Sequence, residues 1–330
     1  MYHLKDIAVV ILNWNGKDLL HTFLPSVISY SEGATLYVAD NASTDDSVLF
    51  LKTNYPEVKI IQNTENGGYA KGYNDALQYI NEPLLCLLNS DIEVTQHWLQ
   101  PILDEFNSSS EIAIVQPKIL DHKKKTHFEY AGAAGGFIDK YAFPYCRGRI
   151  FNTVEENRGQ YDDTQTIFWA SGACFFIKKS VFQKLNGFDE SFFAHMEEID
   201  LCWRAFNLNY ITKYVGTSTV YHIGGATLKN NNPKKTYLNF RNSLFTLVKN
   251  TDKQLFIRTV LRMKLDGIAA FRFLIQLQPL HFFAVIKAHL SFYEALSRLL
   301  KQRKQLKKRP NYYNSNSIVW SYFIQKNKTF

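Results

Sequence analysis

Polar side chains follow three of the apolar runs in the first hundred residues, at the points where buried strands would end. They are Asn13 and Asn15, then Asp40, then Asn89 and Asp91. The Asp40 carboxylate could accept a hydrogen bond from the base or ribose of a nucleotide at the edge of a sheet. Asp91 could hold Mg²⁺ or Mn²⁺, hard cations that prefer carboxylate, water and phosphate oxygens. Taken alone, each residue could equally be a turn or helix-capping residue.

A glycine-containing segment, Asn66-Gly67-Gly68-Tyr69-Ala70, follows another apolar run and opens a predicted helix that contains Asn74. Glycine lets the backbone approach a ligand closely, and the free amides at a helix start favour an anion. The segment matches neither a P-loop nor G-x-G-x-x-G, so an ordinary glycine turn is an equal alternative.

The alternation of apolar runs and helical patterns predicts the elements that position these residues. We expect strands at 7–13, 35–40, 58–62, 84–89 and 112–117, and helices near 17–29, 44–54, 69–80 and 95–107. This spacing implies right-handed crossovers and a mostly parallel sheet flanked by helices. Ligands of such α/β sheets bind beyond the carboxyl ends of the strands, where the polar residues lie.

The second half of the chain gives a mixed pattern. Residues 121–165 are loop-rich, and we expect an irregular or mobile insertion there. The expected elements that follow are an apolar run at 166–177, a short helix at 179–185, a helix from about Glu197, and strands near 211–215 and 218–222. Residues 235–304 predict three helices, divided near Asn250 and at Gln278-Pro279.

The motifs, taken in order, are similar to those of glycosyltransferase family 2, and especially of its bacterial rhamnosyltransferase-like members. The similarity spans roughly residues 6–250, and its segments are Val10 to Gly16, Ala39 to Ser43, Asn66 to Ala70, Asn89 to Asp91, Ser171 to Cys174, Gly187 to Glu190, Glu197 to Arg204, and Tyr221-His222. The resemblance implies a GT-A fold, one Mg²⁺ or Mn²⁺ ion and inversion at the anomeric carbon. The donor it implies is a nucleoside diphosphate-sugar, such as dTDP-rhamnose or a UDP-sugar.

Carried over position by position, the resemblance implies that Glu198 is the catalytic base and that Asp91 and His222 are metal ligands. The predicted donor-binding residues are Asn13, Asn15, Asp40, Asn66, Gly67, Asn74, Asn89 and Arg241. Two positions depart from the family pattern. Asn89 stands where the D-x-D metal motif begins with Asp, and Glu198 stands where the family usually has Asp.

The residues themselves also favour a base near position 198. Glu197 and Glu198 follow an apolar stretch, where desolvation can raise the pKa of a carboxyl group. Glycosyl transfer by displacement needs a carboxylate that takes the acceptor proton. The alternative is an acidic helix start that complements the helix dipole. Asp200 and Arg204, four residues apart, are equally interpretable as a structural pair.

Two other site residues have structural alternatives. His222 would otherwise be a buried strand histidine, the commoner fate of a single His. Arg241 could pair with phosphate, or it could be an ordinary arginine on a helix surface.

Composition bounds the class of protein. The 330 residues are 46% hydrophobic, enough for a full core, and the four cysteines are scattered without a C-x-x-C pair. A reducing compartment fits this cysteine use best. No window offers about 18 uncharged apolar residues, so we expect no membrane-crossing helix and a cytosolic protein.

The charge is unevenly distributed. Residues 251–330 hold 15 Lys and Arg against 3 Asp and Glu, a net +12, whereas the whole chain carries +8, which leaves −4 for residues 1–250. The predicted helices of this second part mix aromatic and basic residues, a pattern typical of helices that lie on anionic membranes. Helices that pack on the catalytic domain with a solvated basic end are the alternative. No recognised motif supports nucleic-acid binding.

The family resemblance implies a GT-A domain at 1–250, and the charge and helix pattern predict a basic amphipathic helical extension at 251–330. We expect an inverting glycosyltransferase that acts on a glycan or lipid-linked acceptor in cell-surface polysaccharide synthesis, peripheral on the inner face of the cell membrane. One alternative is a sugar nucleotidyltransferase, which would need a nucleoside-triphosphate loop near the first strand that is not evident. Another is a non-catalytic nucleotide-sugar-binding or scaffold protein.

Overall fold

The computed structural model describes residues 1–224 and 232–330. The main sheet of the described residues has nine strands in the order β11-β13-β6-β12-β4-β1-β2-β3, with β5 paired to β13. The strands are β1 (Ile7–Asn13), β2 (Thr35–Asp40), β3 (Lys59–Gln62), β4 (Leu84–Asn89), β5 (Ile92–Val94), β6 (Ile112–Asp121), β11 (Thr164–Ile167), β12 (Cys174–Lys178) and β13 (Ile211–His222).

The sheet is mostly parallel, as the sequence predicts. β3, β2, β1 and β4 run parallel, β13 is parallel to β6, and β12 lies antiparallel between β4 and β6. Asn13 is in register with Asp40, and Leu12 with Asn89. Because parallel strands end on one edge, this register brings the polar ends of β1, β2 and β4 together.

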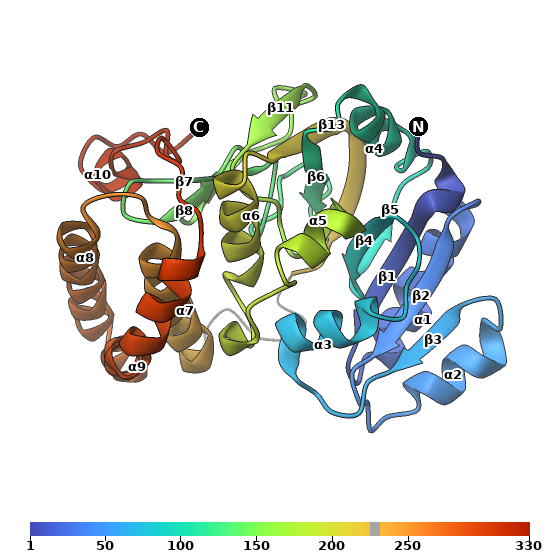
Figure 1. Ribbon diagram of the computed structural model, residues 1–330, viewed down its shortest axis with the longest axis horizontal. Coiled ribbons are helices and arrows are strands. Elements are labelled where there is room, and N and C mark those ends of the chain that lie inside the picture. Colours follow the sequence, from blue (N-terminus) through green and yellow to red (C-terminus); the bar gives the residue numbers. More distant parts are fainter. Residues whose placement is uncertain (225–231) are drawn as a thin grey trace.

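Helices cover both faces of the sheet (Figure 1). They are α1 (Lys17–Tyr30), α2 (Ser47–Asn54), α3 (Gly68–Leu77), α4 (Gln100–Ser108), α5 (Lys179–Lys184) and α6 (Glu197–Asn207), with short 3-10 turns η1 (Leu4–Asp6) and η2 (Glu190–Phe192). Successive side chains of a strand point to opposite faces. Val9 of β1 therefore packs in one core with α1 and α4, and Val10 packs in the other with α3 and α6.

The segment 121–165 differs from the expected irregular insertion. It contains a second, antiparallel sheet of the short strands β7 (Gly136–Ile138), β8 (Pro144–Cys146), β9 (Arg149–Ile150) and β10 (Thr153–Val154). Strands of two or three residues are too short to show an alternating pattern in the sequence. Gly136 packs so tightly on the Trp169 indole that a Cβ there would lie 2.1 Å from the ring.

Two other expectations need correction. The run 166–177 is divided between β11 and β12, which lie apart in the sheet. The two strands expected at 211–215 and 218–222 are one strand, β13, whose pairing with β6 shifts register between Val215 and Thr219. Gly216 lies in this shift, and glycine in a strand often marks such a bulge.

The three predicted C-terminal helices are present as α7 (Pro233–Asn250), α8 (Leu255–Ile275) and α9 (Pro279–Gln305), followed by a short α10 (Ile318–Phe323). They gather at the end of the molecule opposite β3 and α2 (Figure 1). The segment after α9 packs back on α6, where the centre of the Tyr312 ring lies 4.4 Å from that of Trp203. Within the described residues, no helix combines the length and the apolar character needed to cross a bilayer.

Candidate active site

The ends of β1 and β2 form a polar cluster. The buried Asn13 amide donates to Asp40 Oδ1 and to Ser43 Oγ, each over 3.3 Å. Asp40 Oδ2 accepts the backbone N–H of Ser43 over 3.0 Å, which closes the turn after β2. Asn13 Oδ1 is buried and has no hydrogen-bond partner among the described residues. A Cβ on Gly16 would lie 2.4 Å from this oxygen, so glycine keeps the space beside it.

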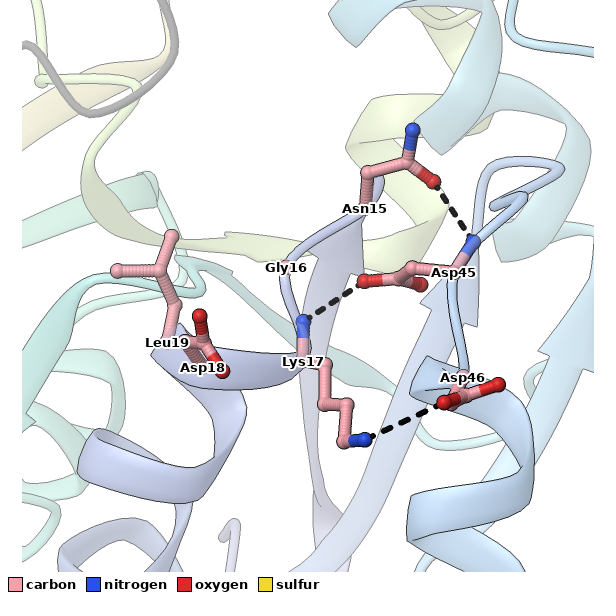
Figure 2. A pocket seen from close by; sticks show the side chains of 7 residues that line it. All are labelled: Asn15, Gly16, Lys17, Asp18, Leu19, Asp45 and Asp46. Atoms are coloured by element: carbon pink, nitrogen blue, oxygen red, sulfur yellow. Dashed lines mark hydrogen bonds and ion pairs between the residues drawn. The ribbon is translucent and has the colours of Figure 1, made fainter.

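Asn15 extends this cluster toward solvent. It has a positive φ of 50°, and its Oδ1 accepts the N–H of Thr44 over 2.7 Å. Beside it lies a shallow hollow of about 460 Å³, lined by Asn15, Gly16, Lys17, Asp18, Leu19, Asp45 and Asp46 (Figure 2). Figure 2 shows two contacts of Lys17 beside this hollow: its backbone N–H donates to the Asp45 carboxylate, and its ammonium group pairs with the Asp46 carboxylate. The hollow adjoins the predicted nucleoside site but includes none of the predicted catalytic or metal-binding residues.

A chain of amides connects β2 to the start of α3. Asn63 donates to Asn41 Oδ1 over 3.0 Å, and Asn41 donates to Asn66 Oδ1 over 2.9 Å. Asn66 Oδ1 also accepts the N–H of Gly68 over 3.0 Å. Gly67 is the N-terminal cap of α3. The predicted donor residues Asn66 and Gly67 are thereby held in a fixed turn at the strand-end edge.

The end of β4 contacts the segment 171–173. Asn89 N–H donates to the Ala173 carbonyl over 2.9 Å. The Tyr69 hydroxyl donates to the neighbouring Gly172 carbonyl over 2.7 Å. A Cβ on Gly172 would lie 3.2 Å from that hydroxyl and 3.8 Å from the Glu198 carboxyl carbon. Gly172 is therefore the point at which the strand ends, α3 and Glu198 meet.

The predicted metal ligands lie together. Asp91 comes directly before β5, and the pairing of β5 with β13 sets Ile92 beside His222. Asp91 Oδ1 is 3.1 Å from His222 Nε2, and both side chains are buried. A third group, Glu129, lies 3.5 Å from His222 Nδ1. Burial alone would lower the pKa of His222, but the hydrogen bonds and charges of the two carboxylates outweigh it and raise the pKa to about 10.

The Asp91 and His222 pair fits a divalent cation by its chemistry and spacing. Two adjacent ligands of an octahedral ion, with bonds of about 2.1 Å, lie about 3 Å apart. The observed 3.1 Å between Oδ1 and Nε2 is the length of their hydrogen bond and is also close to this separation, so an ion could replace the shared proton. In the part of the chain described, no group of three His, Cys, Asp or Glu side chains could hold an ion alone. An ion bound here would therefore need oxygens from water or from a diphosphate.

Glu198 lies in the first turn of α6 beside the buried Glu197, and is itself partly buried with its Oε2 enclosed. Burial is the main cause that raises the pKa of Glu198 to about 7, and backbone hydrogen bonds at the helix start partly offset it. Burial and the charge of Glu198 raise the pKa of Glu197 well above its ordinary value. Each residue has a buried Oε2 without a hydrogen-bond partner among the described residues. A carboxyl poised near neutral pH suits proton transfer.

One buried thiol, that of Cys146, is influenced by the charges of both Glu129 and Glu198. Burial is the main cause that raises the pKa of Cys146, and the charges of Glu129 and Glu198 act in the same direction. The two carboxylates therefore both lie near Cys146, on β8 of the small sheet. The small sheet therefore lies close to Glu129 and Glu198, which the sequence did not indicate.

Two predicted donor-binding residues make contacts with a loop instead. Asn74 donates to the Phe188 carbonyl over 3.0 Å and accepts the Phe188 N–H over 2.9 Å. Arg241 donates to the carbonyls of Ser191 and Phe192 over 3.0 and 3.1 Å. These contacts do not bring either side chain to the polar residues at the strand ends. The role of Asn74 and Arg241 in donor binding stays a prediction.

Asp200 and Arg204 form a buried structural pair. Arg204 Nε lies 2.8 Å from Asp200 Oδ2, and Arg204 also donates to the Leu185 and Gly187 carbonyls. Lys249 of α7 bridges Asp200 and Asp189 over 3.0 and 2.6 Å. With every charge paired, this network ties α6 to α7 rather than serving chemistry.

The sequence matches the profile described as Glycosyl transferase family 2 over residues 8–185, more than half of the chain. The chain belongs to glycosyl transferase family 2. Residues 186–330, which include Glu198 and His222, lie outside the matched part. Their roles therefore depend on geometry and on wider similarity.

Curated relatives of this family 2 protein are distant. A low-salt glycan biosynthesis hexosyltransferase of Haloferax volcanii is 23% identical over 61% of this chain and 62% of its own length. The chain thus covers less than two thirds of that relative. An N-acetylglucosaminyl-diphospho-decaprenol L-rhamnosyltransferase of Mycobacterium tuberculosis is 22% identical over 66% of this chain and 75% of its own length. Rhamnosyltransferase WbbL of Escherichia coli is 22% identical over 66% and 84%.

Solved structures confirm the predicted GT-A fold of the family 2 chain. GalNAc-T7, solved with UDP, GalNAc and Mn²⁺, has a TM-score of 0.62 at 18% identity and covers 97% of this chain and 56% of its own. A mannosyltransferase of Pyrobaculum calidifontis, in complex with GDP-Man and Mn²⁺, has a TM-score of 0.52 at 12% identity, over 88% and 75%. At such identities the likeness concerns the fold alone.

Sequence reasoning missed several residues of the family 2 site. Glu129 lies in an irregular segment after β6, and no motif surrounds it. Asn41 and Asn63 do follow β2 and β3, so the strand-end rule that selected Asp40 could have found them. Tyr69 lies within the glycine segment, and only the structure brings its hydroxyl to Gly172.

Proposed function

We propose that the protein is an inverting glycosyltransferase that moves a sugar from a nucleoside-diphosphate donor to a hydroxyl group of a glycan or lipid-linked acceptor. The observation that carries the proposal is the position of Glu198, a carboxylate with an enclosed, unpartnered oxygen beside Gly172. Asn89, at the end of β4, donates its backbone N–H to the carbonyl of Ala173, the residue after Gly172. Membership of glycosyl transferase family 2 supports this class of reaction.

In this proposal the nucleoside lies at the ends of β1 and β2. Asp40 and Asn13 offer a carboxylate and an amide oxygen to the base or ribose, and Asn15 borders the hollow beside them. Asn66 and Gly67 would contact the donor from the start of α3, and Asn89 would contact it from the end of β4. Asn74 and Arg241 act through the loop that they hold. The donors we favour are dTDP-rhamnose, by analogy with the rhamnosyltransferase relatives, and a UDP-sugar.

Asp91 and His222 would hold one Mg²⁺ or Mn²⁺ ion. When bound, such an ion would neutralise charge on the leaving diphosphate. The protein supplies two ligands, and the departure of Asn89 from the acidic motif leaves that position with an amide instead of a second carboxylate. The buried Glu129 carboxylate, 3.5 Å from His222 Nδ1, would orient the imidazole.

Glu198 would take the proton of the acceptor hydroxyl as this oxygen forms the new glycosidic bond. A single displacement with one base inverts the configuration at the anomeric carbon. Burial keeps the carboxylate poorly hydrated and a stronger base than an exposed Glu. Glu197 would stay protonated beside it, because two adjacent buried carboxylates do not ionise together easily.

The acceptor would be presented at the cytoplasmic face of the membrane, with residues 1–250 as the catalytic part and 251–330 as the extension that binds an anionic surface. An exposed apolar patch at the α8 and α9 connection supports this. It consists of Ile268, Phe271, Ile275, Leu277, Leu280 and Phe283. Each is at least 60% exposed, and Lys264, Arg272 and Lys287 lie in the same helices. Apolar side chains rimmed by basic ones suit an anionic lipid interface.

A transfer assay tests the proposal. The wild-type protein is given radiolabelled UDP-sugars, GDP-mannose or dTDP-rhamnose with Mg²⁺ or Mn²⁺ and a polyprenyl-diphosphate-linked sugar acceptor, and Glu198→Gln is the matched variant. We expect transfer by the wild type alone. Donor binding without transfer by either protein would favour a non-catalytic binding protein. Formation of a nucleotide sugar from a nucleoside triphosphate would favour a nucleotidyltransferase.

A further inference from the structure

The loop that leads into Glu198 has an unusual backbone. Phe193, His195 and Met196 have positive φ values of 64°, 69° and 73°. Non-glycine residues seldom adopt this conformation, and it persists where the surrounding structure holds it in place. Met196 is the N-terminal cap of α6, two residues before Glu198. The position of the proposed base therefore depends on what fixes this loop.

One side chain of α7 holds most of the loop. The Asn242 amide is fully buried and donates to the carbonyls of Phe192, Ala194 and His195 over 3.1, 2.9 and 2.7 Å. Arg241 Nε donates to Asn242 Oδ1 over 2.8 Å. Because the arginine can only donate, this contact fixes which end of the amide faces the loop.

Arg241 completes the attachment. Its Nη2 donates to the Ser191 carbonyl and shares the Phe192 carbonyl with Asn242. The two neighbouring residues thus contact four carbonyls of the segment 191–195. We call Arg241 and Asn242 the loop clamp.

The opposite side of the loop contacts the donor side of the site. The Phe193 carbonyl accepts the Tyr69 N–H over 2.9 Å. Gly68, with φ +79°, comes so close that a Cβ would lie 2.5 Å from the same carbonyl oxygen. Tyr69 in turn binds Gly172 beside Glu198. The loop therefore lies between the start of α3 and the clamp, with Glu198 at its end.

We propose that the loop clamp of Arg241 and Asn242 positions Glu198 against the donor side of the site, so that both are positioning residues and Arg241 does not bind the donor phosphate. This inference depends on the proposed function, because it assigns the clamp a task in proton transfer by Glu198. The clamp touches only backbone of the loop. Its loss should slow the chemical step while leaving nucleotide binding at β1 and β2 intact.

The test compares three variants of the full chain. Asn242→Ala removes the amide, and Arg241→Ala removes the less buried half of the clamp, which lowers the risk of misfolding. Asn250→Ala is the control: Asn250 is an equally buried amide of α7, but it donates to Asp200 and Thr246 instead of the loop. The measurements are thermal midpoint, affinity for UDP and dTDP with Mn²⁺ by calorimetry, single-turnover transfer, and hydrogen exchange of 189–198.

For both clamp variants we expect nucleotide affinity within about twofold of wild type and a transfer rate lower by about 10 to 100-fold, the scale of a small misplacement. Exchange in 189–198 should rise, and Asn250→Ala should show neither effect at a similar thermal midpoint. Weaker nucleotide binding by Arg241→Ala, an equal rate loss in Asn250→Ala, or unchanged rate and exchange in Asn242→Ala would overturn the inference. Absence of transfer by the wild type with every donor would instead refute the proposed function.

Discussion

Replacing Glu198 with Gln separates the proposed chemistry from the stability of the fold. Glutamine keeps the size and hydrogen-bonding capacity of the side chain but cannot take a proton. Nucleotide affinity should persist, since Asp40 and Asn13 lie on the strand ends. Transfer should fall by about 10² to 10⁴, the usual loss when a general base is removed.

The raised pKa of Glu198 also makes the stability of the folded protein depend on pH. Burial raises the pKa of Glu198 from 4.5 to about 7. The folded protein therefore holds this proton more tightly than the unfolded chain, so the stability that it contributes is complete below pH 4.5 and is lost as pH rises through 7. The full difference is about 3 kcal/mol, or about 4 °C in thermal midpoint for a chain of this length. The glutamine side chain does not titrate, so Glu198→Gln lacks this dependence of stability on pH.

The assay combines pH profiles of rate and stability. Between pH 5 and 8 the thermal midpoint of the wild type should fall about 3 to 4 °C relative to that of Glu198→Gln. Wild-type transfer should rise tenfold per pH unit up to about 7 and then level off. Glu197→Gln should keep most of its turnover, and Glu198→Asp should retain activity because the family commonly uses Asp there. Normal turnover in Glu198→Gln, or parallel midpoints across this pH range, would show that Glu198 is not the base or is not held in a desolvated site.

Three further predictions concern the metal, the donor and the membrane. EDTA should abolish transfer, and Asp91→Ala should weaken Mn²⁺-dependent binding of UDP in calorimetry; full activity in EDTA would exclude the proposed metal role. In Gly16→Ala the added Cβ would lie 2.4 Å from Asn13 Oδ1, so this variant should bind nucleotide at least several-fold more weakly with little change in thermal midpoint. Unchanged affinity would show that the nucleoside binds at another place. The double variant Leu277→Glu, Leu280→Glu should lose its binding to phosphatidylglycerol liposomes, whereas Leu49→Glu, at a 65% exposed position on α2, should keep it. Equal pelleting of the wild type and both variants would reject the patch.

The parallel half of the sheet was predictable because its strands are buried on both faces. β1, β2 and β4 have the predicted bounds, since continuous apolar runs ending in Asn or Asp mark both the strand and its end. α2 begins at Ser47 rather than 44, because Asp45 accepts the Ser47 N–H and closes a turn there. The sheet at 136–154 was not predictable, because its strands of two and three residues are stabilised by contacts from distant residues such as Trp169.

The candidate site was predictable where it follows the strand ends and unpredictable where it depends on loops. The pairing of β5 with β13 brings Asp91 and His222 together, although 131 positions separate them in the sequence, and only the resemblance linked them beforehand. Glu129 joins them from an irregular segment that carries no local signal. Arg241 carried a charge that suggested phosphate, but its bonds to two carbonyls depend on the path of the 189–196 loop.

The carboxylates at the start of α6 differ in how their oxygens are paired. Glu197 Oε2 and Glu198 Oε2 are enclosed without a hydrogen-bond partner among the described residues, as are Asn13 Oδ1 at the strand-end edge and other atoms elsewhere in the protein. A buried polar atom left unpaired destabilises a fold by about 1 to 3 kcal/mol. In contrast, the buried Asp200 is fully paired with Arg204, Lys249 and Asn250, which suits a structural role. The unpaired oxygens of Glu197 and Glu198 thus leave hydrogen-bonding capacity that a bound acceptor hydroxyl would fill, whereas both oxygens of Asp200 are already paired.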